Sequence, residues 1–108
     1  MSNTPEGKVK RKGREWLKQN MPDHWFLSPM SGPWGKNGTP DWIICWLGVF
    51  IAIEVKADDG VVSSLQMAQL ELITKAGGVA AVLRGYDVAR LEAIKQAALD
   101  IVNGRSRQ

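Results

Sequence analysis

The part of the sequence that most restricts the fold is TPDWIICWLGVFIAIEVKADDG, residues 39–60. It holds two runs of large apolar residues, 42–47 and 50–56, on either side of Gly48-Val49. A two-residue connection that begins with glycine is typical of a β-hairpin, so the runs predict two antiparallel strands. The pairing of these strands decides which charged side chains meet at the open end of the hairpin, because directly opposed residues share a face of the sheet.

Three charged residues lie near that open end. A turn at Gly48-Val49 places Asp41 opposite Lys56, and Glu54 becomes a diagonal neighbour of Asp41 on the same face. Two carboxylates in apolar surroundings repel each other, and either Lys56 or a divalent cation such as Mg²⁺ would compensate this repulsion. A surface salt bridge explains Glu54 and Lys56 alone, whereas the addition of Asp41 favours a metal site.

The rest of the chain predicts three helices and two further strands. Thr4-Pro5-Glu6 is typical of a helix start, and this helix is expected to end near Gln19. Its inward-facing stripe comprises Val9, Gly13, Trp16 and Leu17. The other predicted elements are strands at 25–27 and 79–83, a helix from Ser63 or Ser64 to about Ala76, and a helix at about 88–102.

These elements give the order α, β, β, β, α, β, α. The strand–helix–strand segment from 50 to 84 predicts two parallel strands joined by a right-handed crossover. We therefore expect an α/β fold, formed as one domain over residues 1–108.

The single cysteine and the distribution of apolar residues bear on where the protein works. Cys45 lies inside the first apolar run, so we expect a buried thiol in a reducing compartment. The polar N-terminus lacks the apolar stretch of a signal peptide, and no run reaches the length of a transmembrane helix. The expected location is the cytoplasm, without a membrane partner.

Basic side chains are concentrated in the first predicted helix. The net charge is only +3, but this helix carries a dense cluster that comprises Lys8, Lys10, Arg11, Lys12, Arg14 and Lys18. A solvated helix face and a nucleic-acid partner explain the cluster equally well.

The single histidine and the tryptophans have competing interpretations. His24 has no partner visible in the sequence, which favours a surface or packing role over catalysis. Trp34, in a loop rich in proline and glycine, is equally suited to stacking on DNA bases and to packing against a second subunit, and Lys36 beside it would contact phosphate. Trp42 and Trp46 lie on the strand face opposite the charged residues, which favours packing in the core or in a dimer.

An aspartate, a spacer and then Glu-x-Lys after an apolar strand occur here as Asp41 and Glu54-Val55-Lys56. Other short motifs accompany them in order: Thr4-Pro5-Glu6, Gly38-Thr39-Pro40, Ser64-Leu65-Gln66 and Gly77-Gly78. Together these motifs resemble the VRR-NUC branch of the PD-(D/E)xK nucleases, in its small stand-alone phage form. The resemblance implies a restriction-endonuclease-like αβββαβα core, in which helices flank a mixed sheet.

The same resemblance implies a metal site. Asp41 and Glu54 would be metal ligands, together with the backbone carbonyl of Val55. Glu6, an acidic residue on the first helix, would complete this site. The implied ion is Mg²⁺ or Mn²⁺.

The resemblance also implies catalytic roles for two further residues. Lys56 would be the catalytic lysine, and Gln66 would orient Lys56 or the attacking water. Gln69 lies one turn further on and competes with Gln66 for this role.

The expected function is a metal-dependent DNA endonuclease, specific for branched DNA such as a four-way (Holliday) junction. Two symmetric incisions imply a homodimer. The phage resemblance implies that the enzyme acts in the cytoplasm of a host cell. The alternatives are a general nickase or restriction-type endonuclease on duplex DNA, and a non-catalytic DNA-binding module on the same fold.

Overall fold

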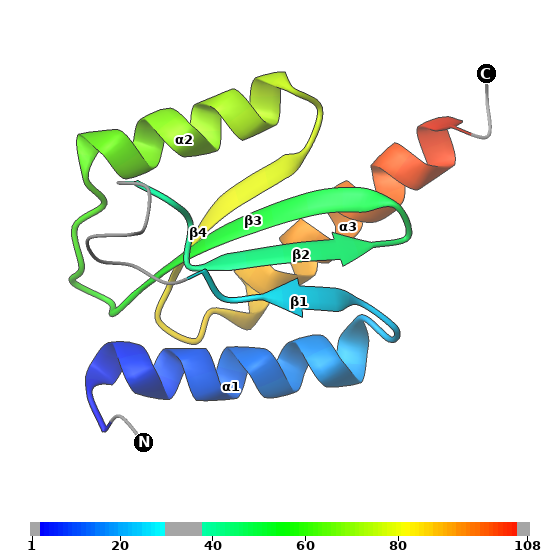
Figure 1. Ribbon diagram of the computed structural model, residues 1–108. Coiled ribbons are helices and arrows are strands. Elements are labelled where there is room, and N and C mark those ends of the chain that lie inside the picture. Colours follow the sequence, from blue (N-terminus) through cyan, green and yellow to red (C-terminus); the bar gives the residue numbers. More distant parts are fainter. Residues whose placement is uncertain (1–2, 30–37, 106–108) are drawn as a thin grey trace.

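A four-stranded sheet lies at the centre of the computed structural model, which describes residues 3–29 and 38–105, and helices cover both of its faces (Figure 1). The elements, in chain order, are α1 (Pro5–Asn20), β1 (Trp25–Leu27), β2 (Trp42–Trp46), β3 (Val49–Lys56), α2 (Ser64–Lys75), β4 (Val79–Arg84) and α3 (Val88–Arg105). The predicted order of helices and strands is confirmed. Trp34 and Lys36 lie outside the described residues.

The sheet is mixed and has the strand order β1-β2-β3-β4. Strands β1, β2 and β3 are antiparallel neighbours, whereas β4 is parallel to β3 as predicted, with α2 as the crossover. Strand β3 therefore has a partner on each side and helices over both faces. This position explains its nearly continuous apolar sequence, because strands covered on both faces do not alternate with polar residues.

The hairpin turn differs from the prediction by one residue. Trp46 pairs with Val49, so the turn residues are Leu47 and Gly48 rather than Gly48 and Val49. Both have positive φ, 53° for Leu47 and 77° for Gly48, as in a type I′ turn. The β-branched Val49 belongs to the strand instead, where its side chain is buried.

Helix α1 packs on the sheet through the four residues that its periodicity predicts, Val9, Gly13, Trp16 and Leu17. Gly13 faces the ring of Trp42 so closely that a Cβ atom there would lie 2.8 Å from a ring carbon. Trp42 and Trp46 are both buried in the core, which decides between the two roles predicted for them. Helix α3 contributes to the same core through Leu91, Ile94 and Ala98.

Two further details depart from the sequence prediction. Cys45 is exposed rather than buried, because it points to the α2 side of the sheet, and α2 packs over β3 and β4. Helix α3 extends to Arg105, whose guanidinium donates to the carbonyl oxygens of Leu47 and Gly48 and so contacts the hairpin turn. None of the helices within residues 3–29 and 38–105 is long and apolar enough to cross a membrane.

Candidate functional site

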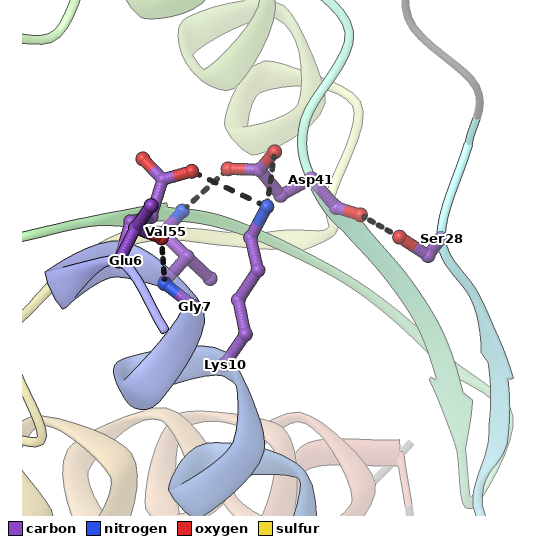
Figure 2. Close-up of polar contacts among 7 residues, drawn as sticks. Glu6, Gly7, Lys10, Ser28, Asp41 and Val55 are labelled. Atoms are coloured by element: carbon purple, nitrogen blue, oxygen red, sulfur yellow. Dashed lines mark hydrogen bonds and ion pairs between the residues drawn. The ribbon is translucent and has the colours of Figure 1, made fainter. Parts of the chain in front are cut away.

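Asp41 and Glu54 meet at the open end of the β2–β3 hairpin. Trp42 pairs with Ile53, so the next step of the ladder sets Asp41 directly opposite Glu54. The sequence prediction had placed Asp41 opposite Lys56, and the one-residue change in the turn accounts for this correction. The Val55 N–H donates to Asp41 Oδ2 at 2.9 Å, and Ser28 Oγ donates to the Asp41 carbonyl oxygen at 3.2 Å (Figure 2).

Glu54 is the only charged residue buried in the described part of the chain, with 1% of its surface exposed. Among the described residues, no donor group reaches either of its carboxyl oxygens. The pKa of Glu54 is raised to about 8, chiefly because the carboxyl group is buried; the adjacent Asp41 carboxyl group contributes to the rise, and nearby Lys56 partly opposes it. Because this pKa lies above 7, Glu54 holds a proton near neutral pH in the metal-free site, and a protonated Glu54 is able to donate to Asp41.

Asp41 is the ionised member of this pair. Burial by itself would raise the pKa of Asp41, but hydrogen bonds from Glu54 and from the Val55 N–H lower it, and Lys10 lowers it as well. These interactions together bring the pKa of Asp41 below its ordinary value. The pair therefore consists of one neutral and one charged carboxyl group, a usual outcome when two acids share a site.

Glu6 and Lys10 approach the pair from the first turns of α1. Thr4 accepts a hydrogen bond from the Gly7 N–H as the predicted N-cap, which fixes the start of the helix. The Lys10 ammonium lies between two carboxylates, 3.4 Å from Glu6 Oε2 and 3.5 Å from Asp41 Oδ1 (Figure 2). Glu6 therefore lies beside the Asp41–Glu54 pair, with Lys10 between Glu6 and Asp41. Within the described residues no three acidic, histidine or cysteine side chains gather closely enough to hold a metal ion.

Lys56 lies at the end of β3, and the two candidate glutamines lie in the first turns of α2. Lys56 follows Glu54 by two residues and so points to the same face of β3, where its charge acts on Glu54. Gln66 forms a capping box at the start of α2, with its Oε1 accepting from the Ser63 N–H at 2.9 Å. This cap leaves its amide NH₂ group for other contacts, and Gln69 lies one turn further along α2.

The oxygen atoms of this site fit a hard divalent cation. Buried carboxyl oxygens without donors are costly, and a positive ion would remove both that cost and the repulsion between the acids. Asp41 and Glu54 supply the carboxylates that Mg²⁺ and Mn²⁺ prefer. The Val55 carbonyl faces the same neighbouring strand as the Val55 N–H, which already contacts Asp41.

The basic residues of α1 divide into two groups. Lys8, Arg11 and Lys12 are exposed, and the Lys12 ammonium lies 5.9 Å from the centre of the Tyr86 ring. Lys10 and Arg14 are partly buried and have defined partners, Lys10 at the acidic pair and Arg14 at His24.

The contact between Arg14 and His24 was missed at the sequence level, where His24 has no visible partner. Arg14 lies within α1 and His24 lies in the connection between α1 and β1, which reverses the chain so that the two side chains meet. The signal in the sequence is only that a helix and a strand are joined by four residues.

Comparison with known proteins places this geometry in a family. The model of the VRR-NUC domain matches residues 6–87. A solved structure described as a VRR_NUC domain is similar to this one with a TM-score of 0.64 and 18% sequence identity, over 86% of this chain and 92% of that chain. None of the curated proteins matches the chain. The family match extends from Glu6 on α1 through the Asp41–Glu54 pair to the turn before α3, and the chain therefore belongs to the VRR-NUC family, a branch of the PD-(D/E)xK nucleases.

Proposed function

We propose that this nuclease-family protein is a Mg²⁺- or Mn²⁺-dependent endodeoxyribonuclease that hydrolyses phosphodiester bonds in branched DNA. The observation that carries the proposal is the pair of carboxyl groups formed by the partly buried Asp41 and the buried Glu54, with Lys56 on the same face. A protein that only binds DNA has no need for such a pair, since burial of the Glu54 carboxyl group costs folding free energy.

The metal ion would be held by Asp41, Glu54 and the carbonyl oxygen of Val55, with Glu6 as the next acidic neighbour. A bound divalent ion lowers the pKa of a water molecule and neutralises charge on a phosphodiester. Glu54 has to lose its proton before it binds the ion, so metal binding is expected to release a proton below about pH 8.

Lys56 supplies the remaining charge at the site. Its ammonium is suited to position the attacking water and to stabilise the negative charge that develops on the phosphate. Gln66 is the glutamine that we assign to orient Lys56 or the water through its free amide group, with Gln69 as the alternative.

DNA would be held mainly through its backbone. The cations of α1 that we assign to this role are Lys8, Lys10, Arg11, Lys12 and Arg14, together with Trp34 and Lys36 in the segment that precedes β2 in the sequence. Such contacts give binding that weakens with salt and depends little on base sequence.

Two incisions in a four-way junction need two active sites, which a two-fold homodimer would supply. Trp25 and Phe50 support this assembly, because they flank Cys45 on one open face of the sheet and each is about half exposed. Light scattering on the wild type and on Trp25→Ser measures the mass, and a wild type that is monomeric at high concentration contradicts the dimer.

A cleavage assay over matched substrates tests the function. Wild type, Lys56→Ala and Lys75→Ala, a control at the far end of α2, are incubated with a four-way junction, a flap and a linear duplex of the same sequence. With Mg²⁺ or Mn²⁺ the wild type and the control should cut the branched DNA, whereas EDTA or Lys56→Ala abolishes cutting. Equal cutting of the linear duplex favours a nickase or restriction-type enzyme, and binding without any cutting favours a non-catalytic module.

A further inference from the structure

Arg14 is held against the edge of the sheet by an aromatic stack. Its guanidinium carbon lies 3.4 Å from the centre of the Phe26 ring on β1. Phe26 in turn makes an edge-to-face contact with Trp42, with ring centres 5.8 Å apart, and Trp42 is buried in the core. The stack therefore fixes the orientation of the guanidinium plane, whereas an arginine that is free on the surface has no fixed orientation.

His24 fixes one edge of the same guanidinium. Its Nδ1 lies 2.7 Å from the carbonyl oxygen of Met21, which only accepts, so Nδ1 carries the proton. In the neutral ring Nε2 is then an acceptor, and it receives the N–H of Arg14 Nη1 at 3.0 Å. One N–H group of Arg14 Nη1 is thereby occupied, and the remaining N–H groups of the guanidinium point in a fixed direction.

The surroundings leave Arg14 without a protein counter-ion. Loss of water lowers the pKa of Arg14, and the neighbouring charge of Glu15 only partly opposes this effect. Glu15 itself forms its ion pair with Lys18, and no carboxylate in the described ranges forms one with Arg14. A partly desolvated cation with free, oriented donors is favourable when an external anion binds it.

The position of Arg14 indicates which anion this is. Lys10, Arg14 and Lys18 follow one another at intervals of four residues and so lie on one face of α1, about 6 Å apart along the helix axis. An open groove of about 580 Å³ runs along this face, and its lining comprises Lys10, Arg11, Lys12, Arg14, Glu15 and Lys18. The row of cations begins with Lys10, which contacts Asp41. It continues with Arg14, which lies against β1 at the edge of the sheet.

We propose that Arg14 binds a backbone phosphate of the DNA strand that is being cut, and that His24 is the residue that positions it. This inference rests on the proposed nuclease function. One DNA strand carries a phosphate about every 3.4 Å along the duplex axis, so the distance from Lys10 to Arg14 corresponds to one or two nucleotides beyond the acidic pair. The path along α1 and β1 thus orients the strand as it enters the site.

Binding of a fluorescently labelled four-way junction, followed by anisotropy in Ca²⁺ at several salt concentrations, tests the assignment. The variants are Arg14→Met, which keeps an apolar contact with Phe26, Arg14→Lys, and the control Lys75→Ala. Arg14→Met should weaken binding roughly tenfold and lower the salt slope by about one, as loss of one phosphate contact does. Arg14→Lys should recover the salt slope but only part of the affinity, because an ammonium does not form the planar fork.

Two variants of His24 separate positioning from packing. His24→Gln retains an acceptor for Arg14 and should bind DNA like the wild type, whereas His24→Ala should approach Arg14→Met. Thermal unfolding of every variant shows whether it is folded. If Arg14→Met matches Lys75→Ala in affinity and salt slope while the wild type binds and cuts DNA, the inference is overturned and the nuclease function stands. A wild type that neither binds nor cuts any DNA overturns the proposed function, and the inference with it.

Discussion

Replacement of Glu54 by glutamine is expected to stabilise the metal-free protein at pH 8 and to change little at pH 5. Glutamine has the shape of a protonated glutamate and still donates to Asp41, but it does not ionise. The folded protein raises the pKa of Glu54 from 4.5 to about 8. A group with a raised pKa stabilises the fold fully below its unfolded value, and this stability is lost as pH rises through the folded value.

The size of the effect follows from this window. Between about pH 5 and pH 8 the unfolded chain has lost the proton while the folded protein keeps it, so unfolding becomes easier by about 1.4 kcal/mol per pH unit. Over the window the wild type should lose on the order of 4 kcal/mol of unfolding free energy, and the glutamine variant should not. The lowered pKa of Asp41 acts in the opposite sense and only in more acidic solution.

Urea denaturation at pH 5, 6.5 and 8 in EDTA measures the prediction, with Glu71→Gln on the exposed side of α2 as the matched control. Mg²⁺ should restore much of the stability of the wild type at pH 8, because an ion that binds only the folded protein stabilises it by mass action. The glutamine variant should respond less. Parallel pH profiles for the wild type and the Glu54 variant would refute the reasoning, since the acid would then not be held protonated by its surroundings.

Three further changes test other parts of the structure. Lys10→Met should tighten Mn²⁺ binding several-fold in calorimetry without DNA, because the Lys10 ammonium contacts Asp41 Oδ1, an oxygen that the ion would take; weaker binding contradicts this. Gly13→Ala should lower the free energy of unfolding in chemical denaturation by about 1–3 kcal/mol. The added Cβ atom would lie 2.8 Å from a ring carbon of Trp42, and the cost of this clash exceeds the gain of about 1 kcal/mol in helix propensity. Leu47→Asn should raise the unfolding free energy by about 1 kcal/mol, because Leu47 has φ of 53° and is 52% exposed, and asparagine adopts this conformation at lower cost; an unchanged value argues against strain at the turn.

The sequence predicts the elements of this fold well because each has a local cause. Thr4 and Ser63 cap their helices, and the periodic spacing of Val9, Trp16 and Leu17 identifies the buried face of α1. Contacts between distant segments have no such local cause. The approach of Lys10 to Asp41 and of Arg14 to His24 depends on how α1 packs against the sheet, which no short motif encodes.

The prediction that Asp41 and Glu54 share a face of the sheet is correct although the predicted turn is wrong by one residue, and the reason is geometric. With a two-residue turn, the numbers of paired residues always add to an odd value, wherever the turn lies along the chain. Moving the turn by one residue therefore shifts the pairing by two and leaves each side chain on its original face. The apolar pattern requires the same faces, since Trp42 and Ile53 have to point into the core together. The two acids are thus brought together by the packing of the hairpin, and the detailed turn decides only that they meet directly rather than diagonally.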